Sequence, residues 1–441
     1  MPLPNIPHEP EEQVLWSTSS PGSGVSFLSR CAVPLLAFLT AAMLGLGISM
    51  ISSATIFKSG NHYFWMQLVW VGCGLVACLT ALLLNLPKLY RLSHWGLLAI
   101  MLPLGYLTAA AVAMKLVGAK ALHFFPCAAA IKGAVRWLRF GGIQIQPSEF
   151  AKIALVLFLA AYYGMIPRKK IKSFLHGVVI PLGSSCILLG LVLLGKDLST
   201  TFVTGMMVIG VMFLAGVRFR YMLMILVIGA VVGTAFIAGS PMRRDRITAW
   251  KHPEENRLSE SYQLFRSQIC LGQGNLFGKG YSKGYVKTYL PEAHTDFIVA
   301  VIGEELGFVG ITGILLGYLG LCACILVISH QCRTRSDLLL CHGIAILISV
   351  QALVNVGVVS GWLPPTGVTA PFLSYGGSSV ISLMEYKRMS SYVSDLIADN
   401  INSINVAQRL GVRAPIMLSP LQRRQKSAST SSGTEIYCSI F

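Results

Sequence analysis

Long apolar stretches without charged residues recur along this chain from about residue 31 to residue 384. About 20 residues of α-helix, at 1.5 Å each, cross the hydrocarbon layer of a membrane, so each stretch predicts a membrane-spanning helix. Backbone polar groups in lipid must find partners within their own segment, which a helix provides. The sequence therefore predicts an all-α fold, a polytopic membrane helix bundle.

About ten transmembrane helices are expected. The predicted spans are residues 31–54, 65–84, 95–115, 149–164, 177–194, 201–217, 221–239, 297–328, 339–361 and 368–384. Lys and Arg concentrate in the short connections 85–94, 165–176, 218–220 and 329–338. Cytoplasmic loops of membrane proteins carry such an excess. The pattern predicts that both termini are cytoplasmic and that the longer loops, 116–148 and 240–296, lie outside.

Three regions follow from this pattern: a flexible cytoplasmic N-terminal arm (1–30), a transmembrane domain (31–384) and a partly disordered cytoplasmic tail (385–441). The net charge of +17 would suggest nucleic acid in a soluble protein. Here much of the excess lies in loops and the tail, where membrane topology and anionic lipid headgroups explain it. No nucleic-acid partner is expected.

The stretch 289–310, YLPEAHTDFIVAVIGEELGFVG, places carboxylates at the start of one predicted span and inside it. Asp296 directly precedes the apolar run, where it could be a helix N-cap, a base facing the outer water, or both. Glu304 and Glu305 follow about 12–14 Å deeper along the helix. Ionisable groups at that depth are costly and usually paired or functional, so a structural interior network is predicted for them.

A second stretch, 136–152, reads RWLRFGGIQIQPSEFAK. Pro147 favours a helix start there. Glu149 and Lys152 form an i,i+3 pair, which could be a helix-stabilising salt bridge. Beside Arg136 and Trp137 at a membrane entrance, the same pair could form a cleft for sugar and phosphate. Trp137 could stack on a sugar or anchor the chain at the membrane interface.

A third stretch, 363–379, reads LPPTGVTAPFLSYGGSS. Its prolines and glycines break helix geometry, and irregular backbone at membrane depth is tolerated only where it is buried or lines a cavity. Ser374, Gly376 and Gly377 are predicted to have structural roles in close packing. The glycine-rich run 272–280 lacks the spacing of a nucleotide-binding loop and a preceding strand, so no nucleotide site is predicted there.

Five motifs follow one another over about residues 30–384: WLRFGGIQIQPSEFAK, GKDLSTT, SYQLFRSQICLGQGNLFGKGYSKG, YLPEAHTDFIVAVIGEELGFVG and LPPTGVTAPFLSYGGSS. Together they resemble the shape, elongation, division and sporulation (SEDS) family, and the PEAHTDFI form is more similar to its division branch. The resemblance implies a bacterial peptidoglycan glycosyltransferase. Such enzymes polymerise lipid II, an undecaprenyl-pyrophosphate-linked disaccharide-pentapeptide, on the outer face of the cytoplasmic membrane, alongside a class B penicillin-binding protein.

The resemblance also implies roles for particular residues. Asp296 matches the essential acidic residue of the family, and it is expected to take the acceptor hydroxyl proton as undecaprenyl pyrophosphate leaves. The residues expected to bind substrate or support the site are Trp137, Arg136, Glu149, Lys152, His294, Glu292 and Lys287. A divalent cation, Mg²⁺ or Mn²⁺, is the candidate cofactor, and no protein metal site is predicted. Other division proteins are expected as further partners in the bacterial inner membrane.

Two other functions remain open at this stage. A flippase for the lipid-linked precursor would need a similar cavity and an intramembrane carboxylate, but it often shows inverted repeats, which this sequence lacks. A non-enzymatic division scaffold would tolerate the loss of Asp296. The chain also departs from the family pattern at its last span, which ends at Met384, is followed by EYKRM and has only about 17 residues, close to the minimum for a span.

Overall fold

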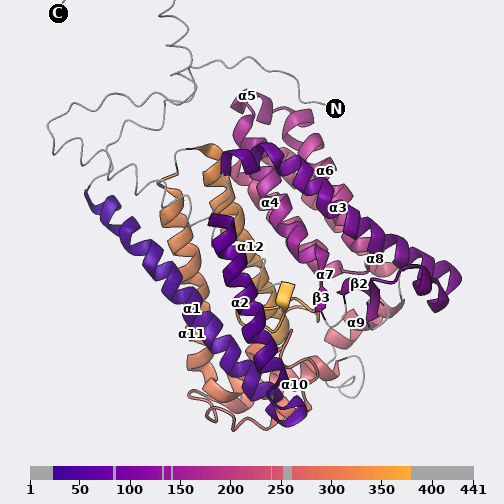
Figure 1. Ribbon diagram of the computed structural model, residues 1–441, viewed down its shortest axis with the longest axis vertical. Helices are drawn as coiled ribbons and strands as arrows, with labels where there is room; N and C mark the ends of the chain where they lie inside the picture. Colours follow the sequence, from indigo (N-terminus) through magenta and orange to yellow (C-terminus); the bar gives the residue numbers. More distant parts are fainter. Residues whose placement is uncertain are drawn as a thin grey trace, which may run out of the picture. The chain divides into compact units, whose positions relative to one another are not determined.

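The computed structural model describes residues 23–82, 86–131, 134–140, 143–239, 241–251, 261–332 and 334–378. Within these ranges the chain is a bundle of long helices with one small sheet (Figure 1). The bundle begins with α1 (Ser23–Ser59), so residues 23–30 of the predicted arm are helical. The predicted tail, 385–441, lies outside the described residues, as does most of the arm.

Seven of the helices in the described ranges are long and apolar enough to cross a membrane. They are α1, α2 (His62–Leu82), α3 (Leu86–Val117), α4 (Pro147–Met165), α6 (Ile180–Leu194) with the π-helical turn η2 (Leu175–Val179) before it, α11 (Ile298–Ser329) and α12 (Arg335–Val359). Two shorter apolar helices, α7 (Leu198–Leu214) and α8 (Phe219–Ala238), coincide with two more predicted spans. The chain is therefore a multi-pass helical membrane protein, and nine of the ten predicted spans are helices.

The tenth predicted span, 368–384, is wrong over its first half. Residues 368–376 are irregular, because Pro371 lacks a backbone donor and both Gly367 and Phe372 have positive φ angles of 77° and 64°. Helix begins only at residue 377, and residues 379–384 lie outside the described part of the chain.

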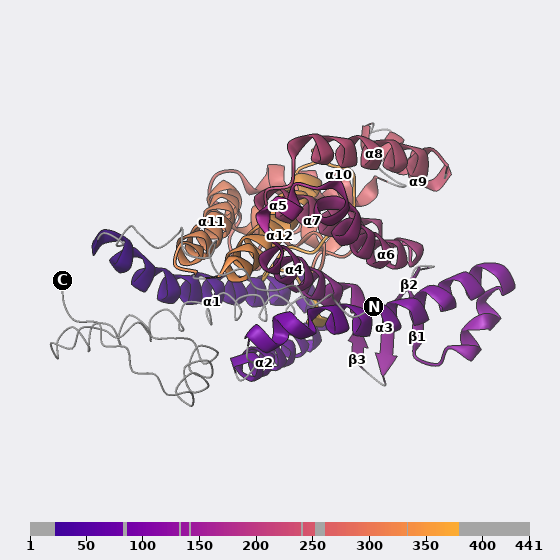
Figure 2. The same ribbon diagram turned by 90° about the horizontal axis from the view of Figure 1, so that it is seen from above.

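Helix α12 occupies the middle of the bundle, where it packs against α4, α7 and α11 (Figure 2). Helix α1 packs along α11, and α3 packs on α4 and α6. Helix α8 contacts α7 and the short helix α9 (Pro241–Lys251), and its apolar side chains are largely exposed, as suits a lipid-facing helix. The buried core therefore centres on α12, whose neighbours bring the polar segments described below to one end of the bundle.

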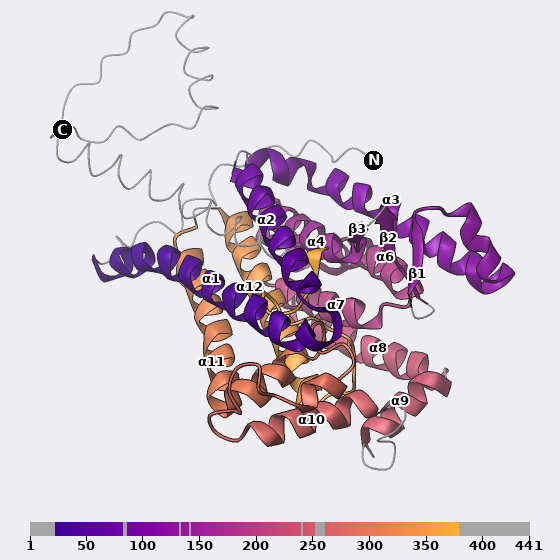
Figure 3. The same cartoon turned by 60° about the horizontal axis from the view of Figure 1, so that its bottom comes forward.

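The two long loops predicted outside contain regular structure. Loop 116–148 holds η1 (Ala119–Phe124) and an antiparallel sheet of β1 (Ala128–Ile131), β2 (Ala134–Phe140) and β3 (Ile143–Ile145). The predicted helix bundle is confirmed, and this small sheet is an addition that the sequence did not predict. Loop 240–296 holds α9, α10 (Tyr262–Gly274) and η3 (Val286–Tyr289), with α10 packed on α11 (Figure 3).

Helix α11 is broken at Gly307, whose φ of 68° and ψ of −159° are not helical. The backbone groups freed by the break bond to the glycine-rich run 272–280. Lys279 and Gly280 donate to the carbonyls of Glu304 and Glu305, each at 3.0 Å, while Phe308 and Val309 donate to Asn275 and Leu276 at 2.9 and 3.1 Å. The run expected not to bind nucleotide therefore completes the hydrogen bonding of a broken helix.

Candidate active site

The irregular segment 363–378 follows α12 and contacts α1, α2, α7, α11 and α12. Tyr318 of α11 donates to the Pro371 carbonyl at 2.7 Å, and the Ala370 amide donates to Ser374 Oγ at 2.8 Å. A Cβ built on Gly47 of α1 would meet Leu373 backbone at 2.7 Å, and one on Gly377 would meet the Trp70 ring of α2 at 2.2 Å. The segment is mostly buried, and side chains satisfy much of its backbone, as irregular structure at membrane depth requires.

Asp296 lies in a turn immediately before α11, half-buried. The N-cap residue of α11 is Phe297, with no side-chain capping bond, so the N-cap reading of Asp296 is wrong. Its carboxylate lies against the irregular segment: a Cβ built on Gly367 would be 3.2 Å from Asp296 Oδ2. Asn355 of α12 donates to the Asp296 carbonyl at 2.8 Å and to the Val368 carbonyl at 2.6 Å. The carboxylate is thus fixed at the end of the bundle that carries the two long loops, without being deeply buried.

Three aromatic rings meet beside this turn. The His294 ring lies 4.6 Å from Tyr63 of α2 and 5.7 Å from Tyr375, and the two tyrosine rings are 5.1 Å apart. The Tyr375 amide also donates to the His294 carbonyl at 2.8 Å. At neutral pH a phenol carries its proton and a carboxylate does not. Asp296 is the better candidate for a base at this end.

Glu292 begins the same turn in a left-handed conformation, with φ of 54°. The Thr295 hydroxyl lies 3.2 Å from the Glu292 carbonyl and 3.2 Å from its Oε2, and the Thr295 amide donates to the same carbonyl at 3.1 Å. These contacts shape the turn that presents Asp296. The structure therefore brings Glu292, His294 and Asp296 together, as predicted.

Glu304 and Glu305 form the interior network predicted for them, each 0% exposed. Glu304 accepts the backbone amides of Tyr285, Val286 and Lys287 at 2.7, 2.8 and 2.9 Å, which caps η3. Glu305 accepts from the Ser53 hydroxyl at 2.5 Å, from the Ser282 amide at 3.0 Å and from Lys287 Nζ. Each buried carboxylate has three donors.

Lys287 belongs to this network. Its side chain is 0% exposed, and Nζ donates to Glu305 and, at 2.6 Å, to Ser53 Oγ. Lys287 was expected to bind substrate or to support the site, and its burial is compatible only with the supporting role. The physical reason is burial: an ammonium in the interior needs a carboxylate partner, and Glu305 is that partner.

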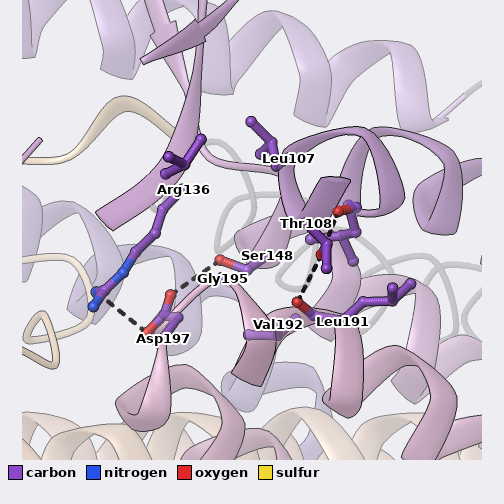
Figure 4. Close-up of a pocket in the computed structure, with 10 residues that line it drawn as sticks. Leu107, Thr108, Arg136, Ser148, Leu191, Val192, Gly195 and Asp197 are labelled. Carbon is purple, nitrogen blue, oxygen red and sulfur yellow. Dashed lines mark hydrogen bonds and ion pairs between the residues drawn. The ribbon is translucent and has the colours of Figure 1, made fainter. Parts of the chain in front are cut away.

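A second polar group surrounds Asp197, at the start of α7 (Figure 4). Arg136 reaches from β2 to Asp197 Oδ1 at 3.6 Å and to the Lys196 carbonyl. Gln146 Nε2 and Ser148 Oγ lie 2.9 and 3.4 Å from Asp197 Oδ2. Arg136, Ser148 and Asp197 border a small hollow. Its apolar wall is formed by Leu104, Leu107, Val135, Leu191 and Val192. An arginine at the edge of an apolar hollow can contact a ligand that has a charged head and an apolar tail.

Asp197 was not among the predicted site residues. It is buried at 4% exposure, and its side chain caps α7 by accepting from the Thr200 amide at 3.2 Å. The signal in the sequence is a single acidic residue between two apolar spans, followed by Ser and Thr. That pattern predicts a cap, but it does not reveal that Arg136, 61 positions earlier in the chain, reaches the same carboxylate.

Glu149 and Lys152 lie in the first turns of α4, which begins at Pro147 as predicted. They pair at 2.8 Å between Lys152 Nζ and Glu149 Oε1, and both are buried. Glu149 Oε2 is also buried and has no hydrogen-bond partner in the described part of the chain. Trp137 is half-buried in β2, next to Arg136.

The irregular segment joins the two polar groups. The hydroxyl of Ser199, two residues after Asp197, donates to the Thr366 carbonyl. The backbone amide of Gln146 donates to Ser378 Oγ at 3.0 Å. Gly367 adjoins the Asp296 carboxylate. The Asp296 turn and the Asp197 group therefore flank one buried segment at the end that carries both long loops. Of the predicted residues, Glu292 and His294 lie with Asp296, and Arg136 lies with Asp197. Lys287 lies in the buried network, and Glu149 and Lys152 form a separate buried pair.

Comparison with known proteins agrees with this arrangement. The sequence model of the FtsW/RodA/SpoVE family, described as cell cycle proteins, matches residues 28–390. The chain is 34% identical to the probable peptidoglycan glycosyltransferase FtsW of Geobacter metallireducens, over 79% of this chain and 90% of that protein. It is 33% identical to the protein of the same description from Coxiella burnetii, over 78% and 90% of the two chains.

Solved structures show the same fold. A chain from a peptidoglycan synthase complex, reported as coordinating polymerization and crosslinking, matches with a TM-score of 0.67 and 28% identity, covering 82% of this chain and 97% of that one. The rod shape determining protein RodA of Thermus thermophilus matches with a TM-score of 0.59 and 27% identity, over 82% and 95% of the two chains. The family match, the relatives and the fold together show that this chain belongs to the FtsW/RodA/SpoVE family.

Proposed function

We propose that this protein is a peptidoglycan glycosyltransferase of the division branch, which polymerises lipid II into glycan strands at the outer face of the bacterial inner membrane. Relatives over most of its length are named as probable glycosyltransferases of this kind. A structural relative belongs to a complex that coordinates polymerization with crosslinking. On that basis we propose a class B penicillin-binding protein as the partner, with other division proteins around it.

One observation supports the catalytic role of Asp296 above all others. Among Asp296, Glu304 and Glu305, the two glutamates are fully buried and each accepts three hydrogen bonds. Asp296 is half-buried in the turn just before α11. A general base must reach the proton that it removes, and Asp296 is the one of the three that a substrate outside the bundle can approach.

The proposed step is a glycosyl transfer. Asp296 takes the proton from the 4-hydroxyl of the acceptor's terminal GlcNAc while that oxygen bonds to the anomeric carbon of the donor sugar. The bond between the anomeric carbon and the pyrophosphate oxygen breaks, and undecaprenyl pyrophosphate leaves with the electron pair. A mouth position suits this substrate, whose lipid lies in the bilayer and whose sugars lie in water.

Arg136 is the candidate to stabilise the leaving pyrophosphate. Asp197 and the Lys196 carbonyl hold its guanidinium at the edge of an apolar surface, where it can face the charged head of a lipid-linked substrate. The described residues contain no group of three or more His, Cys, Asp or Glu side chains able to hold a metal ion. No step of this proposal depends on a divalent cation.

The test is polymer formation from purified lipid II, by the full chain with its candidate partner in liposomes. Asp296→Asn keeps the size of the side chain and removes the base, and we expect the rate to fall by about 10²–10⁴-fold. The thermal unfolding midpoint of both proteins provides the folding control. Polymer from Asp296→Asn at the parent rate would contradict the base assignment.

A second arm separates the enzyme from a transporter. Lipid II placed on the inner leaflet of the liposomes would reach the outer leaflet only if the protein moved it across. Movement across the membrane without polymer, under conditions in which a relative makes polymer, would overturn the proposed function in favour of a flippase. Neither polymer nor movement would favour a scaffold.

A further inference from the structure

Asn355 is a buried amide in a helix that is otherwise mostly apolar. It lies near the outer end of α12, is 1% exposed, and belongs to the helix at the middle of the bundle. A primary amide at such a position loses its hydrogen bonds to water, which is unfavourable unless protein groups replace them. The structure provides those groups from two segments outside the helix.

The Asn355 side chain makes two hydrogen bonds, and Nδ2 donates both of them. Asn355 Nδ2 donates to the Asp296 carbonyl at 2.8 Å and to the Val368 carbonyl at 2.6 Å. An amide nitrogen has two hydrogens, so both donors are used. Asn355 Oδ1 is buried and has no hydrogen-bond partner in the described part of the chain. The contacts that set the position of this side chain are therefore the two donated bonds.

The two carbonyls belong to the segments that meet at the Asp296 carboxylate. One is the backbone carbonyl of Asp296 itself. The other belongs to Val368, which follows Gly367, and a Cβ built on Gly367 would lie 3.2 Å from Asp296 Oδ2. Gly367 has a φ of 77°, so a side chain there would be strained as well as crowded. Asn355 therefore joins the segment that carries the carboxylate to the segment against which the carboxylate rests.

Other bonds hold these segments at different points. Tyr375 donates its amide to the His294 carbonyl at 2.8 Å, and Tyr318 donates to the Pro371 carbonyl at 2.7 Å. The bond from Asn355 is made to the backbone of Asp296 itself. Because a displacement of about 1 Å in a reacting group can cost about a hundredfold in rate, this attachment bears directly on catalysis.

We infer that Asn355 is a positioning residue, which fixes the Asp296 carboxylate against the 366–368 backbone by donating one hydrogen bond to each segment. This inference rests on the proposed function only for its effect on rate. The attachment of the two segments is a property of the fold that can be measured without substrate.

The test compares Asn355→Leu with Gln351→Leu in the full chain. Each change replaces a buried amide with an apolar side chain on α12, one helical turn apart, and only Asn355 bonds to the two segments. The first readout is hydrogen–deuterium exchange over 290–300 and 366–376. Its reporters are the hydrogen-bonded amides of Ala300, Ala370, Ser374 and Tyr375.

We expect faster exchange in both segments of Asn355→Leu and parental exchange in Gln351→Leu. In the polymerisation assay, Asn355→Leu should lower kcat by about tenfold to a hundredfold, with little change in the KM for lipid II, because a displaced base acts on the transition state. Asn355→Gln, which keeps the donors one methylene further out, should recover part of the rate. It also takes the place of Asn355→Leu should the latter fail to fold.

Parental exchange in folded Asn355→Leu would overturn the inference, as would equal loosening in Gln351→Leu or an unchanged kcat. If the parent protein makes no polymer, the proposed function fails by that result, and the exchange comparison still decides whether Asn355 joins the two segments.

Discussion

Two carboxylate sites, one just before α11 and one inside it, have opposite characters. In the turn before the helix, Asp296 is half-buried and is held through its backbone. Deeper in α11, Glu304 and Glu305 are 0% exposed and are held through their side chains by three donors each. A half-buried carboxylate at the end of the bundle can be approached by a substrate. A carboxylate whose oxygens are occupied stabilises the fold, and the comparison assigns chemistry to one site and structure to the other.

The largest effect should come from breaking the buried ion pair. In Lys287→Met, Glu305 loses its ammonium partner while remaining buried, and we expect the free energy of unfolding to fall by about 3–5 kcal/mol. Thermal and denaturant unfolding in detergent measure the change. The double variant Lys287→Met with Glu305→Gln should recover part of the loss, because no charge is then left unpaired. Unchanged stability in Lys287→Met would contradict a structural role for this site.

The break in α11 permits a second test of the deeper site. A Cβ on Gly307 would lie 2.3 Å from the Gly278 nitrogen, and the residue has a φ of 68°. Gly307→Ala should therefore cost about 2–4 kcal/mol through left-handed strain and crowding. Gly313→Ala is the matched control in the same helix, because its Cβ would meet no atom within 4 Å. Equal unfolding midpoints for the two variants would show that the break is not required.

The smallest effect on stability is expected at Asp197. Asp197→Asn keeps an N-cap acceptor for the Thr200 amide but removes the charge that faces Arg136. Because the Arg136 side chain is 34% exposed, solvent weakens this ion pair, and we expect less than about 1 kcal/mol of destabilisation. The polymerisation rate should still fall, since Arg136 is no longer oriented. A stability loss as large as that of Lys287→Met would place Asp197 with the structural carboxylates.

Apolar periodicity and length were sufficient to predict most of the bundle. Nine spans could be recognised because each is a long apolar run, and Pro147 marked the start of α4. The short strands β1 to β3 could not, because three to seven residues carry little pattern. The break at Gly307 was also hidden, since the apolar run continues through it and the compensating bonds come from residues 275–280.

The parts of the candidate site whose residues are close together in the sequence could be predicted. Asp296, Glu292 and His294 stand together in the sequence and in the structure, and the pair Glu149–Lys152 follows from helical spacing. The role of Lys287 was not predictable, because its partners Ser53 and Glu305 come from two distant helices. Arg136 and Asp197 pair across the chain for the same reason. Long-range pairing of charges leaves no periodic signal in one sequence.

The most direct test compares Asp296→Asn with Lys287→Met. It asks whether Asp296 acts in catalysis while the buried site of Lys287 and Glu305 acts in stability. For each protein, the rate of glycan formation per folded molecule and the unfolding midpoint would be determined in the same membrane. The account predicts that Asp296→Asn keeps the midpoint and loses the rate, while Lys287→Met loses the midpoint and its folded fraction keeps the rate. Polymer at the parent rate from Asp296→Asn would contradict it.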